Sequence, residues 1–331
     1  MCAYRSAADT RALVVRRPTG LRAWQSLIGD EIELCVEDDE SDPDRVAGAL
    51  ARVAGRCELL LGPYSTQLMR AAGRAMEDVE RLLWNHGGSG DDVQTQCAGR
   101  LVSVPAPTSR YAEPFVRACA GEATRGPLWV VRGQGSFARQ VAAGAVRQAE
   151  RVGLQVLEKR ADENGASLGE APETWDLFSV GRFEDDVAIV NEARSAPRPP
   201  RAVCSVAAGV RDFVSMVDDP DGIYGIAQWF PGREARPELG PSEHDFVTAY
   251  RRITDAWPDY PAVQAAATGA LALHCAQVAG STEADALWAA ATGLETTTLY
   301  GAFRIDSQTG MQLGHAPVLL RWDDGEPALV A

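Results

Sequence analysis

Two short stretches of the chain carry residue types that could hold a small anion. Residues 59–66 read LLLGPYST, and residues 84–92 read WNHGGSGDD. In each, an apolar run typical of a buried strand leads into a loop of small residues with a hydroxyl near its end, and a helix is expected next. Loops that follow parallel strands meet at one edge of the sheet, where hydroxyls and backbone N–H groups bind carboxylates. The pattern predicts an anion pocket there.

Each candidate residue also has a structural interpretation. Ser65 and Thr66 could bind a ligand, but either would also serve as the N-cap of the following helix. Gly88 and Ser89 could form a carboxylate-binding nest of backbone N–H groups. The same loop could instead be an ordinary strand-to-helix turn capped by Ser89 or Asp91. Both interpretations are left open by the residues alone.

No catalytic or metal-binding set is predicted. His86 lies beside the second loop, but a single loop histidine is more often a surface or capping residue than a base. The other histidines are scattered, and no Ser/His/Asp or Cys/His spacing is present. The seven cysteines are widely spaced without a CxxC pair, which argues against zinc. We therefore expect a non-enzymatic protein with no catalytic residue, no metal and no cofactor.

Charge, apolar runs and cysteine usage limit the class of partner and the compartment. The net charge of −14 over 331 residues argues against nucleic acid and anionic membranes as partners. No apolar run appears long enough to span a membrane, and residues 1–9 lack the apolar core of a signal peptide. Cys35, Cys57 and Cys204 lie in apolar runs as buried hydrophobes, which fits a reducing compartment. A cytoplasmic chain is expected as given, or an extracytoplasmic one if a leader was removed.

Strand-like and helix-like segments alternate along most of the chain, which predicts an α/β fold with parallel strands and right-handed crossovers. The predicted strands are 12–15, 31–37, 57–61, 81–84, 101–104, 128–132, 154–157, 202–206, 223–229, 298–305 and 317–322. The predicted helices are 42–53, 66–79, 111–123, 136–152, 242–257, 262–278 and 283–292. Residues 161–174 are expected to form a surface loop.

The order of motifs resembles that of the branched-chain amino acid and amide binding proteins of ABC transporters, which have the type I periplasmic binding protein fold. The matching segments are residues 33–43, 62–66, 86–89, 104–112, 128–140, 224–231, 259–264 and 297–306 with 310, 314–315 and 321–325. The resemblance implies two α/β lobes with parallel sheets flanked by helices and three hinge crossings. It divides the chain into a first lobe of residues 1–115 and 228–296 and a second lobe of residues 116–227 and 297–331.

In this family a small ligand lies in the cleft between the lobes. Carried over by position, the resemblance implies a ligand gripped from the first lobe by hydroxyls and backbone, and covered from the second by an aromatic ring. The predicted ligand-binding residues are Trp24, Tyr64, Ser65, Thr66, Gly88, Ser89 and Phe137. Trp24 would form a pocket wall, Tyr64 would border the cleft, and Phe137 would close over the ligand.

Two departures from the family pattern leave the ligand's identity open. Residues 16–30 appear too short for the usual helix and its return loop. Residues 217–222 (VDDPDG) stand where the family has a strand, a carboxylate loop and a helix. Asp218, Asp219 or Asp221 could replace that carboxylate.

The leading interpretation is a solute-binding protein for an amino-acid-like or amide ligand that carries a carboxylate. Its partners would be this small molecule and an ABC permease or a regulatory protein, without nucleic acid or membrane insertion. The alternative is a cytoplasmic ligand sensor, or a pathway accessory protein, on the same fold.

Overall fold

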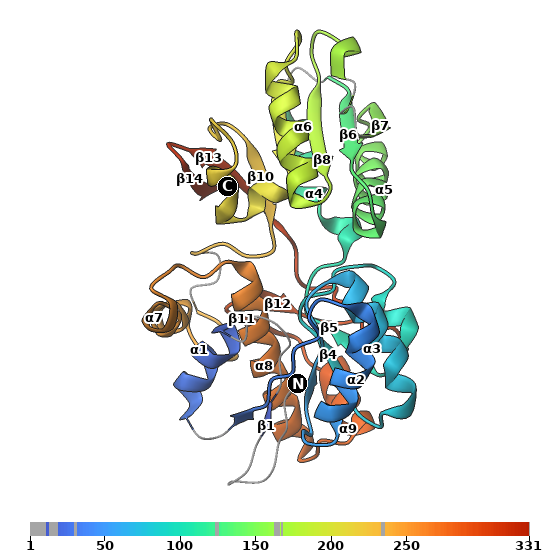
Figure 1. The fold of residues 1–331 in the computed structure, drawn as a ribbon, viewed down its shortest axis with the longest axis vertical. Helices are drawn as coiled ribbons and strands as arrows, with labels where there is room; N and C mark the ends of the chain where they lie inside the picture. The colour runs from blue at the N-terminus through green and yellow to red at the C-terminus, as the bar shows by residue number, and fades with distance from the viewer. Residues whose placement is uncertain are drawn as a thin grey trace. The chain divides into compact units, whose positions relative to one another are not determined.

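The chain forms two compact units connected by three crossings (Figure 1). The structure is a computed structural model that describes residues 11–12, 19–29, 32–122, 126–161, 166, 168–232 and 236–330. The first unit contains residues up to Pro107 together with Pro231–Ala316, and the second contains Thr108–Phe230 and Pro317–Ala331. The boundaries differ from the predicted ones mainly at residues 297–316, which lie in the first unit. The physical reason is local pairing, since the Leu239 amide donates to the Thr297 carbonyl at 3.0 Å.

The first unit is built around a parallel sheet in the order β3-β4-β5. Its elements are β1 (Arg11–Ala12), α1 (Thr19–Ile28), β2 (Glu33–Leu34), α2 (Pro43–Ala54), β3 (Leu60–Leu61), α3 (Thr66–Ala75), β4 (Leu83–Asn85), β5 (Leu101–Ser103), α7 (Glu243–Thr254), α8 (Tyr260–Ala279), α9 (Ala284–Thr292), β11 (Thr296–Thr298) and β12 (Gly301–Phe303). Short 3-10 helices cover Met76–Asp78 and Val93–Gln96.

The three strands of this sheet bury both faces. Side chains alternate along a strand, so Leu60, Leu83 and Leu101 lie on the face that packs with α2 and α3. Trp84 therefore lies on the opposite face, where β4 contacts α8. Figure 1 shows α2 and α3 on one side of β4 and β5, with α8 on the other. This double cover explains why these strands read as continuous apolar runs.

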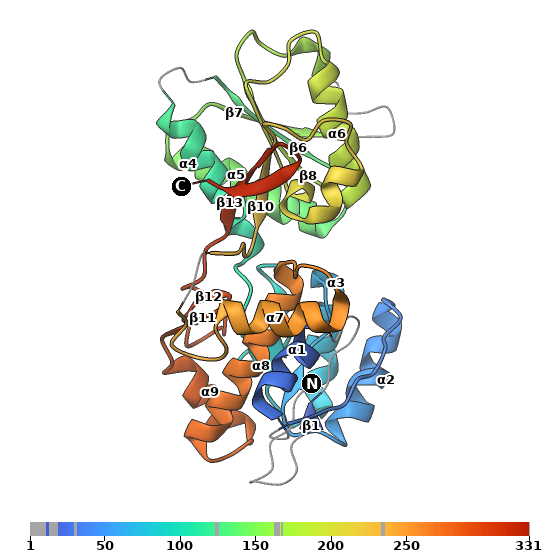
Figure 2. The same ribbon diagram turned by 90° about the vertical axis from the view of Figure 1, so that its left-hand side faces the viewer.

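A helix is present where the sequence analysis expected too little room for one. α1 occupies Thr19–Ile28 and packs against α7 and α8 (Figure 2). Only ten residues are needed, because α1 lies directly on its neighbours. Trp24 is 1% exposed, and its ring lies so close to Gly269 of α8 that a Cβ there would sit 2.7 Å from it. Trp24 is thus a core residue of the first unit rather than an open pocket wall.

Helix α8 is longer than the predicted helix 262–278 by two residues at its start and one at its end. Among the described residues, Tyr260–Ala279 alone is long and apolar enough to cross a membrane, with a mean hydropathy of 1.2. However, 72% of that window is buried inside the protein. Such burial is typical of the central helix of a soluble core.

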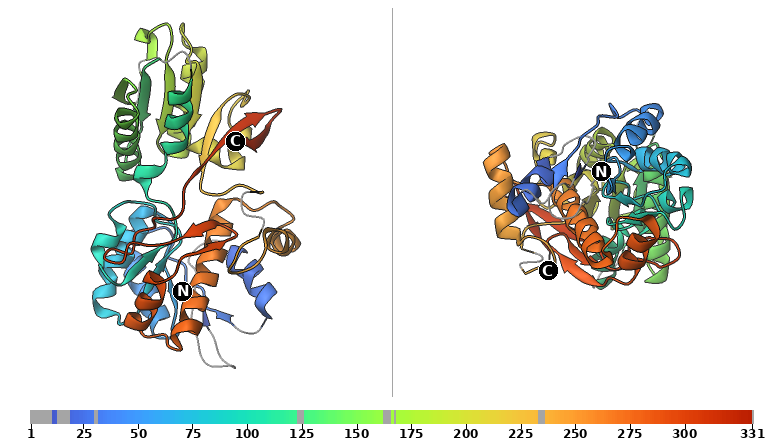
Figure 3. Two further views of the ribbon diagram at one scale, coloured as in Figure 1. Left: turned by 180° about the vertical axis from the view of Figure 1, so that it is seen from behind. Right: turned by 90° about the horizontal axis from the view of Figure 1, so that it is seen from below.

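The second unit is organised on a seven-stranded sheet in the order β14-β13-β10-β9-β8-β6-β7. The five strands from β10 to β7 are parallel, and β13 and β14 add an antiparallel edge, visible in red in the left view of Figure 3. Its elements are α4 (Glu113–Gly121), β6 (Leu128–Arg132), α5 (Ser136–Arg151), β7 (Val156–Arg160), β8 (Asp176–Val180), α6 (Phe183–Ser195), β9 (Ala202–Ser205), β10 (Tyr224–Ala227), β13 (Val318–Asp323) and β14 (Glu326–Leu329).

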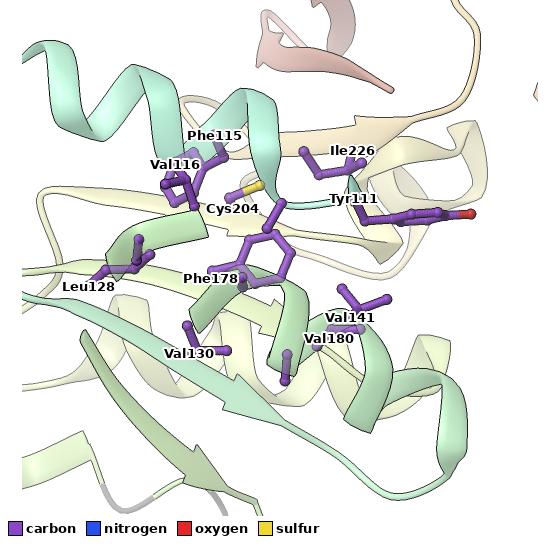
Figure 4. Close-up of a cluster of buried hydrophobic side chains, with 14 of the residues drawn as sticks. Tyr111, Phe115, Val116, Leu128, Val130, Val141, Phe178, Val180, Cys204 and Ile226 are labelled. Carbon is purple, nitrogen blue, oxygen red and sulfur yellow. The ribbon is translucent and has the colours of Figure 1, made fainter. Parts of the chain in front are cut away.

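Two apolar clusters cover the faces of this sheet. On one face, Phe178 of β8 and Cys204 of β9 pack with Phe115 of α4 and Val141 of α5 (Figure 4). On the other face, Leu177 and its neighbours pack with α6. The sequence analysis missed β8, the central strand between them. Its run DLFSV is short and begins with Asp176, a charged residue that is unusual at the start of a buried strand. The Asp176 carboxylate is fully buried and accepts hydrogen bonds from Arg201 Nη2 at 2.6 Å and from Arg201 Nε at 2.9 Å.

Most other predicted elements are present with boundaries shifted by a few residues. The predicted strand 298–305 is wrong as a single strand, because β11 and β12 are two short antiparallel strands joined by a turn. Residues 13–15 and 31 of two predicted strands lie outside the described residues, as do residues 162–165 and 167 of the predicted loop. The segment 217–222 does not form a strand and helix. Asp219 pairs with Arg194, and the amide of Gly325 donates to Asp221, so this segment is a turn tied to α6 and to the β13–β14 turn.

Candidate ligand-binding loops

The loop after β3 contains a serine in a backbone conformation that normally requires glycine. Ser65 has φ 141° and ψ 157°. Only glycine adopts this region without strain, and a side chain there costs of order 1–3 kcal/mol. Its Oγ accepts a hydrogen bond from the Leu68 amide at 3.2 Å and so caps α3. Because the Oγ uses a lone pair for the cap, its own hydrogen stays available to an acceptor.

Thr66 ties the two loops to each other. It is 7% exposed, and its Oγ1 accepts a hydrogen bond from the Gly90 amide at 3.0 Å. Ser89, the residue before Gly90, is 8% exposed. The predicted hydroxyl residues of both stretches are thus brought together at the end of β3 and β4, as the sequence analysis expected of parallel strands.

A buried asparagine that the sequence analysis did not single out shapes the second loop. Asn85 Oδ1 accepts hydrogen bonds from the amides of Gly87 and Gly88, at 3.1 and 2.7 Å. Its Nδ2 donates to the Gly88 carbonyl at 2.6 Å and to Ser103 Oγ at 2.8 Å. The Gly88 amide is therefore bound inside the protein, as in the strand-to-helix turn that was one of the two alternatives left open by the sequence. The only sequence signal was an Asn at the end of an apolar strand, where a hydrophobic residue is more usual.

The glycines of the loops allow close packing. A Cβ on Gly88 would lie 2.5 Å from Met69 Cγ, and one on Gly87 would lie 2.6 Å from the Tyr64 Cα. Side chains at these positions would push the two loops apart. The small residues thus allow the close packing of the two loops.

His86 is buried and uncharged. It is 2% exposed, and its ring centroid lies 6.3 Å from that of Tyr64. Burial lowers the pKa of the His86 imidazole to about 3, although a hydrogen bond with the Gly62 backbone opposes this shift. Within the part of the chain that the structure describes, its Nδ1 has no hydrogen-bond partner. A neutral imidazole with an open nitrogen can accept a hydrogen bond, but it cannot attract an anion by charge.

Tyr64 is the most exposed of the predicted site residues in the first unit, at 37%. Its hydroxyl lies 3.5 Å from that of Tyr260, the first residue of α8. Arg70 of α3 forms an ion pair with Asp92 at 2.7 Å, so this nearby cation is neutralised. The groups of these loops that are of a type to interact with an anion are the Ser65 hydroxyl and the N-terminus of α3.

The second unit holds the remaining predicted residue and a loop of similar form. Phe137, in the first turn of α5, packs edge-on against Tyr111 with ring centroids 5.6 Å apart. The N-cap of α5 is Gly135, with φ 98° and ψ 166°. Among the residues that the structure describes, no group of three or more His, Cys, Asp and Glu side chains could hold a metal ion.

Comparison with known proteins places this architecture in one family. A family model described as periplasmic binding protein matches residues 19–327. An ABC transporter substrate-binding protein from Desulfitobacterium hafniense, solved with leucine, superposes with a TM-score of 0.80 at 16% identity, covering 97% of this chain and 100% of the other. Curated proteins give no match.

Two further solved structures have similar folds. The leucine-binding protein LivK from Thermotoga maritima has a TM-score of 0.76 at 13% identity, covering 98% of both chains. A solute-binding protein of an ABC transporter from Rhodopseudomonas palustris, in complex with 3,4-dihydroxybenzoic acid, has a TM-score of 0.77 at 14% identity, covering 97% of this chain and 94% of the other. These likenesses confirm the predicted two-lobed type I periplasmic binding protein fold.

Proposed function

Because the chain belongs to the periplasmic binding protein family, we propose that it binds a small carboxylate-bearing solute through the loops that follow β3 and β4. The observation that carries the proposal is the backbone of Ser65. A non-glycine residue held at φ 141° costs stability, and glycine would cap the helix almost as well. A serine retained there at such a cost is explained if its hydroxyl contacts a ligand.

The chemistry of the ligand follows from what these loops offer and from the relatives. Similar structures contain leucine, isoleucine, 3,4-dihydroxybenzoic acid or p-hydroxybenzoic acid, and all four molecules carry a carboxylate. A hydroxyl donor at the N-terminus of α3 suits a carboxylate better than a cation. Asp218, Asp219 and Asp221 lie in a turn, so we do not assign them the ligand's amine, and an ammonium group is not required of the ligand.

The role we propose is that of the solute-binding component of an ABC transporter, with a permease as its protein partner. Support comes from the family and from the ABC transporter proteins among the similar structures. The chain would act by binding, without catalysis, on the outer side of the cytoplasmic membrane. Fractionation of cells that express the gene from its chromosomal start would test the location.

A matched set of acids and amides tests the ligand class. Thermal unfolding would be measured with leucine, isoleucine, 4-hydroxybenzoate and 3,4-dihydroxybenzoate, and with leucinamide and 4-hydroxybenzamide, which lack the carboxylate. Acetamide and urea would represent small amides. A ligand at about 100 times its Kd stabilises the protein by about 2.7 kcal/mol, so a hit is easily detected. We expect an acid to bind and its amide to bind much more weakly. Binding of the amides alone would contradict the proposal.

A further inference from the structure

Two cysteines of the first unit lie with their thiols in contact. Cys35 follows β2, Cys57 precedes β3, and both belong to the apolar cluster under α2 and α3. The thiol of Cys57 forms a hydrogen bond with that of Cys35, and both cysteines are reduced in the structure. Cys35 is 5% exposed and Cys57 is 2% exposed.

Ion pairs hold the two chain segments side by side at this point. Glu37, two residues after Cys35, accepts hydrogen bonds from Arg52 Nε at 2.9 Å and from Arg56 Nη1 at 3.3 Å. The other guanidinium nitrogen of Arg56, Nη2, lies 3.6 Å from the Cys35 Sγ. The carboxylate and the guanidinium thus fix the register that brings residue 35 next to residue 57.

We propose that Cys35 and Cys57 form a reversible disulfide when the protein meets a small-molecule or protein disulfide. The proposal is independent of the ligand-binding function. The Arg56 guanidinium lies beside the Cys35 sulfur, and Cys35 is the more exposed of the two thiols, so we assign it the first attack on the external disulfide. Burial raises the pKa of the Cys57 thiol to about 12, so Cys57 is the poorer first nucleophile.

The exchange balances in two steps. The Cys35 thiol loses its proton to solvent, and its sulfur attacks one sulfur of the oxidant, breaks the S–S bond and releases one thiol. The Cys57 sulfur, after losing its own proton, then attacks the Cys35 sulfur of the mixed disulfide and releases the second thiol. The two protein thiols lose two electrons together, and the external disulfide is reduced to two thiols.

The cross-link would enclose the whole of α2, which lies between the two cysteines. α2 packs against α3, the helix that Ser65 caps. The disulfide would therefore restrict the movement of α2 beneath the loop that contains Ser65. A closed loop restricts the unfolded chain and therefore raises the melting temperature of the folded one. Disulfides persist in oxidising compartments such as the periplasm, so an exported chain would carry this one in its resting state. Such a resting state differs from the reducing compartment that the burial of these cysteines in apolar runs suggested.

Peptide mapping of the full-length protein tests the proposal. The protein would be incubated folded with oxidised glutathione, then unfolded, alkylated and digested with trypsin. We expect residues 23–45 and 57–70 to appear as one cross-linked species that dithiothreitol separates. Oxidised wild type should melt at a higher temperature than reduced wild type. Cys35→Ser should remove both effects, while Cys97→Ser, at another cysteine of the first unit, should keep both.

Two results would overturn the proposal. One is full alkylation of Cys35 and Cys57 after the folded wild type has been exposed to excess oxidised glutathione, a measurement that needs no variant to fold. The other is a cross-link that joins Cys97 to Cys35 or Cys57 as often as these two join each other, because random oxidation would produce it.

Discussion

Ser65 and Gly135 both have positive φ with an extended ψ, and each lies at the corresponding place in its own unit. Each is the N-cap residue of a helix that follows a parallel strand, with φ 141° and ψ 157° for Ser65 and φ 98° and ψ 166° for Gly135. In the second unit the residue is glycine, for which this backbone carries no strain. In the first unit it is serine. A positive φ is therefore common to both N-cap positions, whereas the hydroxyl is present only in the first unit.

Reciprocal substitutions at these two positions test that separation. Ser65→Gly should relieve strain of order 1–3 kcal/mol while losing only a few tenths through the weaker cap. Ser65→Ala keeps the strain and loses a cap contribution of about 1 kcal/mol. Urea unfolding should therefore rank Ser65→Gly above Ser65→Ala, and both should lose affinity for the carboxylate ligand.

Gly135→Ala is the matched control for the strain. No atom lies within 4 Å of a Cβ built on Gly135, so any destabilisation by this substitution reports backbone strain alone. We expect a loss of about 1–3 kcal/mol. If Gly135→Ala unfolds at the wild-type urea concentration, or Ser65→Ala proves as stable as Ser65→Gly, the strain argument for Ser65 fails.

Asn85 should hold the second loop more strongly than any other side chain there. Asn85→Ala leaves the Gly87 and Gly88 amides without their acceptor, and the buried Gly88 amide alone should cost about 1–3 kcal/mol. The free energy of unfolding in denaturant should fall, and the Kd measured by calorimetry should rise. Ser103→Ala removes one of the contacts of Asn85 but leaves both amides bound, so it should have the smaller effect on affinity. Equal losses in Kd would show that the loop does not depend on Asn85.

The buried His86 should make the protein less stable in acid. Its folded pKa of about 3 lies below the value of 6.5 expected in the unfolded chain. As pH falls below 6.5, His86 binds a proton in the unfolded state but stays neutral in the folded state. The contribution of His86 to the free energy of unfolding is therefore complete above pH 6.5 and is lost as pH falls towards 3. The slope from this group is at most about 1.4 kcal/mol per pH unit. His86→Gln should flatten the urea midpoint between pH 6.5 and 4.5, and an unchanged slope would contradict the shift.

A buried carboxyl in the second unit acts in the opposite direction. Burial raises the pKa of Asp186 to about 7 from 3.8, although the Ala207 amide, which donates at 3.0 Å, opposes the shift. The folded state therefore keeps a proton that the unfolded state releases, and this contribution to stability is lost as pH rises from about 3.8 to 7.

Asp186→Asn keeps an acceptor for Ala207 and cannot titrate. We expect the variant to gain stability over wild type at pH 8 relative to pH 4.5, as measured by unfolding in urea at both pH values. Asp185→Asn is a useful comparison, because Asp185 lies on the same helix and its pKa is lowered, chiefly by a hydrogen bond with Arg182. It should change stability without the same gain at pH 8.

The amino-acid sequence alone was enough to predict the fold class, most of the strand and helix order, and the meeting of the loops after β3 and β4. Apolar runs at β3 and β4, each followed by glycine and a hydroxyl, indicated parallel strands whose loops meet, and in the structure Thr66 joins them through Gly90. These features are local, because strand composition, turn residues and helix caps act over a few neighbouring positions.

Contacts between distant parts of the chain determine which atoms of the loops are already hydrogen-bonded or buried inside the protein. Asn85 occupies the Gly88 amide, Trp24 packs into the core beside Gly269, and Ser65 is held at a φ that its residue type disfavours. Residues 297–316 joined the first unit through a pairing with Leu239. Each of these outcomes depends on contacts between residues that are distant along the chain or on a backbone angle that such contacts impose. Composition and spacing do not specify either.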